Sequence, residues 1–212
     1  MTLPVILIGF GGHAKVLIEI LQLLRIPIVG ATDIVSREEL SPHVTLLGND
    51  EIILQYKTDS IRLVNGLGSV DSTRRRKMTF ERWSKEGYSF ATLAHPSATI
   101  SSNAQIHDGA QIMAGAIIQA GSRIGENTII NTGASVDHDC DIGSHVHLAP
   151  GVTLSGKVTV GDETHIGTGA IIIQGIRVGI NCLVGAGSVV LDNIPDRSVV
   201  YGNPARVVKT LG

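Results

Sequence analysis

Aromatic side chains are scarce in this sequence. Its 212 residues include only three Phe, three Tyr and one Trp, and none of these lies between residues 91 and 200. Rings normally supply much of a globular core, so their absence predicts a core too thin for them over the C-terminal half. Cysteine is also rare. The two present, Cys140 and Cys182, make a disulfide framework untenable, and we expect both to be packed inside as free thiols.

An excess of charge and long apolar runs are also lacking. The net charge is only −2, which favours neither nucleic acid nor a membrane surface as a partner. We interpret the basic cluster Arg74–Lys77 as a solvated helix face. No apolar run approaches the roughly 20 residues that span a bilayer, and the N-terminus lacks the basic region of a signal peptide. We therefore expect a cytoplasmic protein.

Branched aliphatic residues recur every six positions from Ile100 to Val190 without interruption. Helices and ordinary strands have periods of about 3.6 and 2 residues. A six-residue period is typical instead of a parallel β-helix, in which each hexad is one short strand and its corner. Three hexads complete a coil, so residues separated by about 18 positions are predicted to stack roughly 4.8 Å apart.

Two other positions of the repeat predict features of this prism. Apolar residues on its flat sides, such as Ile117, Ile129 and Ile171, favour self-association, and a homotrimer fits a three-faced prism best. Glycines that directly follow the aliphatic residues are expected to form corners with unusual φ angles, and they stand at Gly125, Gly143, Gly161, Gly167, Gly179 and Gly185.

The first part of the chain has a different pattern. Residues 1–94 alternate strand and helix signals, which predicts a small Rossmann-like parallel sheet domain ahead of the β-helix domain of residues 95–212. The expected elements are strands at Leu3–Ile8, Ile26–Gly30 and Ile61–Val64, with a helix after Gly9–His13 that reaches about Leu24.

The turn Gly9–His13 lies between the first strand and this helix, a context in which glycine lets the backbone approach a phosphate. Asp33 follows at about the distance expected of an acid that binds a ribose. Many α/β turns carry two glycines without a ligand, so a purely structural turn is the alternative. Because the domain is too short for a full dinucleotide fold, a mononucleotide or nucleotide-sugar is the predicted ligand.

Histidines and acids gather in one stretch of the repeat. His138 precedes Asp139, an acid able to raise its basicity and hold its tautomer, as in a general base; a solvent-facing corner is the alternative. His147 and His165 should stack, whereas His138 and His147 should lie on different sides of the prism. If both serve one site, that site lies between subunits. The spacing of His145 and its neighbours differs from that of γ-class carbonic anhydrases, so no metal is predicted.

The Gly-x-Gly-Gly-His turn, the hexads and the segment Ala134–Gly143 together resemble the NeuD/PglD-type hexapeptide sugar acetyltransferases, and the closing Tyr201–Arg206 segment is similar to that of hexapeptide acyltransferases. The resemblance covers essentially the whole chain and implies a left-handed β-helix. It implies that His138 is the general base and that Asp139 takes the place of an acid that is often Glu in the family.

The resemblance also implies binding roles. It implies that Gly11, Gly12 and His13 form the turn that binds the nucleotide-sugar, together with Asp33 and Gly68. It implies that Asn131 lines the acceptor site. It implies that His147 lies near the thioester of acetyl-CoA and that the corners at Thr168 and Ala186 contact the pantetheine arm. Cys140, on an inward position, is not expected to act as a nucleophile.

The function that the resemblance implies is direct acetyl transfer from acetyl-CoA to the 4-amino group of a nucleotide-linked 4-amino-4,6-dideoxy sugar. An O-acetyltransferase of sialic acid and a non-catalytic nucleotide-sugar-binding trimer are the alternatives. Residues 33–37 and 65–70 are expected to select the base. The sequence alone names neither the base nor the sugar.

Overall fold

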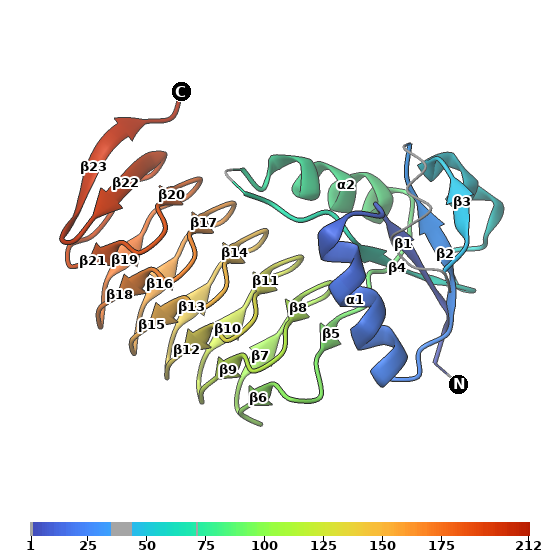
Figure 1. The fold of residues 1–212 in the computed structure, drawn as a ribbon, viewed down its shortest axis with the longest axis horizontal. Helices are drawn as coiled ribbons and strands as arrows, with labels where there is room; N and C mark the ends of the chain where they lie inside the picture. Colours follow the sequence, from blue (N-terminus) through green and yellow to red (C-terminus); the bar gives the residue numbers. More distant parts are fainter. Residues whose placement is uncertain (1, 35–43, 71) are drawn as a thin grey trace.

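The computed structural model describes residues 2–34, 44–70 and 72–212. A small sheet with two α-helices forms one end, and a stack of coils leads from it to a C-terminal hairpin at the other end (Figure 1). The parallel sheet followed by a left-handed parallel β-helix confirms the predicted fold class. Neither α-helix in the described ranges is long and apolar enough to cross a membrane.

The N-terminal sheet has four parallel strands in the order β3-β2-β1-β4. Strand β1 (Val5–Ile8), one of the two inner strands, is buried along its whole length. Helix α1 (Gly12–Leu23) buries its apolar side through Ala14, Leu17, Ile18 and Leu21. The sequence did not predict β3 or η1. The elements are β1 (Val5–Ile8), α1 (Gly12–Leu23), β2 (Ile28–Thr32), β3 (Leu46–Gly48), the 3₁₀ helix η1 (Asp50–Gln55), β4 (Arg62–Asn65) and α2 (Arg74–Lys85).

Each hexad of the β-helix forms a two-residue strand and a corner, and the strands build three sheets that we term the first, second and third faces. The first face contains β5 (Leu93–Ala94), β8 (Gln111–Ile112), β11 (Ile129–Ile130), β14 (His147–Leu148), β17 (His165–Ile166), β20 (Leu183–Val184) and the antiparallel hairpin of β22 (Ser198–Gly202) and β23 (Ala205–Thr210).

The other two faces consist entirely of two-residue strands. The second face contains β6 (Thr99–Ile100), β9 (Ile117–Ile118), β12 (Ser135–Val136), β15 (Thr153–Leu154), β18 (Ile171–Ile172) and β21 (Val189–Val190). The third face contains β7 (Gln105–Ile106), β10 (Arg123–Ile124), β13 (Asp141–Ile142), β16 (Thr159–Val160) and β19 (Arg177–Val178).

Residues 18 positions apart stack, as the hexads predict. On the first face His147 pairs with His165 and Leu148 with Ile166. The inner aliphatic residues from the second coil onward are almost fully buried and form one continuous apolar core. Cys140 and Cys182 are buried free thiols, which confirms the expectation for both.

The glycines that directly follow the aliphatic residues do not have the unusual φ angles predicted for them. Positive φ occurs instead at the third residue after the inner aliphatic, where Gly alternates with residues such as Asn127 and Asp139, at φ of 52° and 58°. The glycines serve close coil-to-coil approach instead: a Cβ on Gly125 would lie 2.5 Å from backbone atoms of Gly143. Backbone crowding, rather than torsion, therefore requires glycine there.

The two parts of the chain share a core. Leu93, Met113 and Ile129 of the β-helix belong to the same buried cluster as the inner side of α1. The prediction that Ile129 lies on an open side is therefore wrong, because the N-terminal part covers the first coils of the first face. Ile117 and Ile171, on the second face, are exposed as expected, at 37% and 42%.

The crowding at Gly125 yields a stability test. Gly125→Ala should lower the free energy of unfolding by about 1–3 kcal/mol, since the added methyl group meets backbone that cannot rotate away. Gly115→Asn is the matched control: Gly115 has φ +67° and open space around its Cβ direction, and Asn accepts this conformation. Thermal unfolding of both variants measures the difference, and equal losses would contradict this explanation.

Candidate active site

The turn after β1 presents a helix N-terminus to an open pocket. Gly11 is the N-cap of α1 and supplies no side-chain cap, so the first N–H groups of the helix remain available for an anion. A Cβ on Gly11 or Gly12 would meet nothing within 4 Å. Glycine at these two positions thus leaves room for a ligand and is not required by packing.

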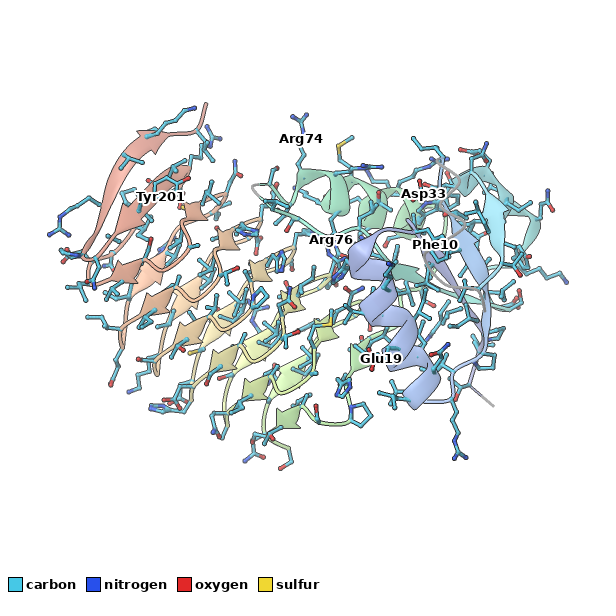
Figure 2. All side chains as sticks on the ribbon, in the orientation of Figure 1. Phe10, Glu19, Asp33, Arg74, Arg76 and Tyr201 are labelled. Atoms are coloured by element: carbon cyan, nitrogen blue, oxygen red, sulfur yellow. The ribbon has the colours of Figure 1, made fainter. Side chains whose placement is uncertain are left out.

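Asp33 and Gly68 lie beside this turn. The backbone N–H of Phe10 donates to Oδ2 of Asp33 over 2.9 Å, so this carboxylate braces the turn; Figure 2 shows the two residues next to each other. Gly68 approaches His13 closely, with 3.3 Å from an added Cβ to the Cβ of His13. Sequence reasoning had assigned Asp33 to a ligand and had not foreseen this bracing contact.

A pocket of about 590 Å³ joins this turn to the β-helix. It brings together all six residues expected to bind the nucleotide-sugar and its acceptor group, and His147 as well. Of the predicted base-selecting segment 33–37, residues 35–37 lie outside the described residues. The pocket is lined by Phe10, Gly11, Gly12, His13, Val16, Asp33, Ile34, Gly66, Leu67, Gly68, Ser69, Val70, Arg75, Asn131 and His147.

A second pocket, of about 510 Å³, runs along the first face and the adjoining corners. It contains the three residues expected to contact the coenzyme: His147, Thr168 and Ala186. Thr168 and Ala186 stand at exposed corners, and within the described ranges no hydrogen-bond partner is found for either backbone N–H. Such a row of open donors suits the amide carbonyls of an extended pantetheine arm.

The two pockets share a wall made of Ser69, Val70, Asn131 and His147. In this wall Nδ1 of His147 lies 2.6 Å from Oγ of Ser69, and Nε2 lies 3.0 Å from Nδ2 of Asn131. The ring meets that of His165 edge to face, with 4.9 Å between centroids. Groups of two ligands, one in each pocket, would therefore come together at His147.

Burial keeps both histidines of the first pocket neutral. Burial, aided by the charges of His165, His13 and Arg76, lowers the pKa of His147 to about 2. Burial and the charge of Arg76 lower the pKa of His13 to about 4, although a hydrogen bond to Gln111 opposes the shift. These rings act as hydrogen-bonding groups at neutral pH and not as cations.

His138 and Asp139 lie at a different corner, between the second and third faces. Nδ1 of His138 is 2.9 Å from Oδ2 of Asp139, and both side chains are about half exposed. Neither residue lines the two pockets. A Cβ on Gly156 would lie 2.4 Å from Nε2 of His138, so glycine in the next coil makes room for the ring. The structure thus separates His138 from His147 within one subunit.

Arg76 contradicts the interpretation of Arg74–Lys77 as a solvated helix face. Its side chain is 1% exposed, and in Figure 2 it points from α2 toward the junction with the β-helix, whereas Arg74 points away. Nη1 donates to the carbonyls of Asn65 and Leu67, and Nε donates to that of Asn127. Burial lowers the pKa of Arg76 to about 9, so the guanidinium stays charged at neutral pH.

Sequence reasoning missed Gln111 and Gly156, and it placed Ser69 in the segment 65–70 expected to select the base without foreseeing its bonds to the histidines. Gln111 joins the two parts of the chain, since its Oε1 lies 2.8 Å from Nε2 of His13 and its Nε2 donates to the carbonyl of Asn65. One signal was available: Gln111 stands on the same face and register as His147, two coils earlier. No sequence signal pointed to the bonds between Ser69 and the two histidines, because these bonds span 78 and 96 residues.

Cys140 is a poor nucleophile. Burial raises the pKa of the Cys140 thiol to about 11, which disfavours the reactive thiolate. Among the residues that the structure describes, no group of three or more His, Cys, Asp or Glu side chains is arranged to hold a metal ion.

The β-helix of hexads, the Rossmann-like domain in front of it and the two adjoining pockets define this protein's class as that of the hexapeptide-repeat acyltransferases. Family models agree: residues 4–81 match the PglD N-terminal domain, and residues 121–156 match the bacterial transferase hexapeptide (six repeats). A search of curated proteins gave no match.

Solved structures narrow this class to a family. A mutant of perosamine N-acetyltransferase from Caulobacter crescentus, in complex with CoA and GDP-perosamine, is 34% identical over 97% of each chain, with a TM-score of 0.90. The acetyltransferase domain of PglB from Neisseria gonorrhoeae, in complex with acetyl coenzyme A, is 33% identical over 98% of this chain and all of that one, with a TM-score of 0.89. WeeI from Acinetobacter baumannii, at 23% identity and a TM-score of 0.87, shares the fold.

This chain belongs to the PglD-type sugar acetyltransferases, as the resemblance in the sequence predicted.

The neutral histidines predict a pH-dependent stability. Because the pKa values of His13 and His147 are lowered in the folded state, the unfolded chain binds more protons below pH about 6.5. The stabilisation is present above that pH and is lost as the pH falls toward 4. As the pH is lowered, the free energy of unfolding should fall less steeply in His147→Gln than in the wild type. The difference between the two slopes should be about 1.4 kcal/mol per pH unit, the contribution of one histidine. Urea unfolding between about pH 7 and 4 measures this, and parallel curves for the two proteins would refute it.

Proposed function

We propose that the protein transfers the acetyl group of acetyl-CoA to the 4-amino group of a nucleotide-linked 4-amino-4,6-dideoxy sugar. The observation that carries this proposal is the wall shared by the two pockets. One pocket has the open helix N-terminus of an anion site, the other has a row of free backbone donors, and both end at Asn131 and His147. The diphosphate of a nucleoside diphosphate sugar fits the anion site, and the amide carbonyls of a pantetheine arm fit the backbone donors.

Support for the acceptor comes from two sources. Gly11, Gly12 and the α1 N-terminus offer N–H groups to a diphosphate, and Asp33 lies at the edge of the same pocket. The Caulobacter relative is solved with GDP-perosamine, a nucleotide-linked sugar. A free sialic acid would leave the anion site at the turn without a diphosphate, so O-acetylation of sialic acid is the weaker alternative. A cytoplasmic location stays a prediction.

His138 acts as the general base in this proposal. Asp139 accepts a hydrogen bond from Nδ1–H of His138, which leaves the Nε2 lone pair to take a proton. As that proton leaves the acceptor amine, the amine nitrogen bonds to the thioester carbonyl carbon. The C–S bond then breaks, and the imidazolium of His138 gives its proton to the leaving sulfur, so that CoA departs as the thiol and His138 is neutral again. Free backbone N–H groups are suited to stabilising the oxyanion.

Replacement of the base tests this role. His138→Ala should lower kcat by about 10²–10⁴-fold while the affinity for acetyl-CoA stays unchanged, because the pocket assigned to the coenzyme, with Thr168 and Ala186, keeps all its lining residues. Thiol release is measured against a panel of nucleotide-linked 4-amino sugars and sialic acids, and calorimetry measures binding. His107→Ala, an exposed corner histidine outside both pockets, is the control. Near wild-type turnover by His138→Ala would eliminate His138 as the base.

A homotrimer completes the proposed site. His138 stands between the second and third faces, whereas His147 stands on the first face of the same prism. One subunit therefore cannot bring both to one acceptor, but a neighbouring prism can supply the missing corner. The exposed Ile117 and Ile171 of the second face give this contact apolar surface.

Mixed trimers test the shared site. His138→Ala and His147→Ala homotrimers should both be inactive. When the two variants are co-refolded, an interface that combines the intact His138 of one subunit with the intact His147 of the other is restored, and random assembly yields about a quarter of wild-type activity. Thiol release measures the recovery. If each site belonged to a single subunit, no mixture would recover activity.

A further inference from the structure

Ser69 is the one side chain of the N-terminal part, among the described residues, that bonds to both stacked histidines. Its Oγ lies 2.6 Å from Nδ1 of His147 and 3.3 Å from Nδ1 of His165. It also lines both pockets. The residue lies on the segment that follows β4, where Gly66, Leu67 and Gly68 line the first pocket.

The proton positions in this network follow from its fixed members. The backbone N–H of Thr132 donates to Oδ1 of Asn131 over 2.8 Å, which sets the orientation of that amide. Nδ2 of Asn131 therefore faces His147 and donates to its Nε2. A ring whose Nε2 accepts, and whose burial keeps it neutral, carries its proton on Nδ1.

The direction of the bond to Ser69 is thereby determined. Nδ1–H of His147 donates to Oγ of Ser69, and the hydroxyl hydrogen of Ser69 is left to point at Nδ1 of His165. Without this acceptor, the buried Nδ1–H of His147 would lose its partner, which typically costs about 1–3 kcal/mol. The opposite tautomer would put an N–H against the amide of Asn131. Ser69 and Asn131 thus hold the ring from its two ends.

We propose that Ser69 is a positioning residue that holds His147 in its Nδ1-protonated tautomer, with the Nε2 lone pair at the wall between the two pockets. That lone pair accepts from Nδ2 of Asn131 in the structure, so an N–H of a bound ligand reaches it only by taking the place of this amide. Because Ser69 belongs to the segment that lines the first pocket, a nucleotide-sugar that contacts this segment also sets the orientation of His147. The tautomer is independent of the proposed function, whereas the effect on turnover rests on it.

Nuclear magnetic resonance reports the tautomer directly. In protein labelled with ¹⁵N-histidine, the signals that vanish in His147→Gln belong to His147 and should show a protonated Nδ1 at neutral pH. In Ser69→Ala they should shift toward the Nε2-protonated form or broaden, and in Ser69→Thr, which keeps the hydroxyl, they should stay as in the wild type. Unchanged His147 signals in Ser69→Ala would overturn the proposal whatever the substrate is.

Kinetics tests the consequence for turnover. Ser69→Ala should lower kcat by about 10–100-fold with little change in the KM of the nucleotide-sugar, since a misplaced group weakens the transition state more than ground-state binding. Ser69→Thr should restore most of kcat. Ser72→Ala is the matched control, because Ser72 lies on the same segment and bonds to the backbone of Arg74 rather than to a histidine. Equal losses in Ser69→Ala and Ser69→Thr would overturn the positioning role.

Discussion

The backbone ladder between coils is the interaction on which the rest of the structure depends. Strands of only two residues have too few side-chain contacts to hold their own register, so the register comes from hydrogen bonds to the coils on either side. One coil fixes the place of the next, and each repeat contacts mainly its neighbours. Gly125 and Gly161 show how strict this spacing is, since the next coil's backbone fills the place of their missing Cβ.

This ladder also fixes where chemical groups stand. It puts Gln111, Ile129, His147 and His165 in one line on the first face, at successive coils. The N-terminal part covers the first half of that line, where Gln111 meets His13 and Ile129 enters the shared core. At His147 and His165 the cover is the segment of Ser69, which bonds to both rings, and the two pockets meet there. The junction of the two parts, and no single element, therefore decides where a pocket opens.

The parts of this architecture that local pattern determines could be predicted from the sequence. The hexads gave the coils, the stacking of His147 on His165 and the burial of Cys140, because these follow from counting along the chain. Contacts between distant segments could not be counted in this way. Ile129 is covered by α1, and Ser69 reaches His165 across the domain junction. Neither the packing of α1 on Ile129 nor the bond between Ser69 and His165 produces a periodic pattern in the sequence.

Arg76 shows why the charge pattern misled and what the buried charge does. A run of four basic residues has the composition of an exposed surface, yet Arg76 faces the junction, where three backbone carbonyls accept its hydrogen bonds. Carbonyl dipoles only partly compensate a full charge, and no carboxylate pairs with it in the described part of the chain. The remaining field helps to keep His13 and His147 neutral. The charge of Arg76 thus lies next to Leu67, which lines the first pocket, while the histidines of that pocket are neutral. A positive charge there favours an anionic ligand, and the neutral imidazoles stay available as hydrogen-bonding groups.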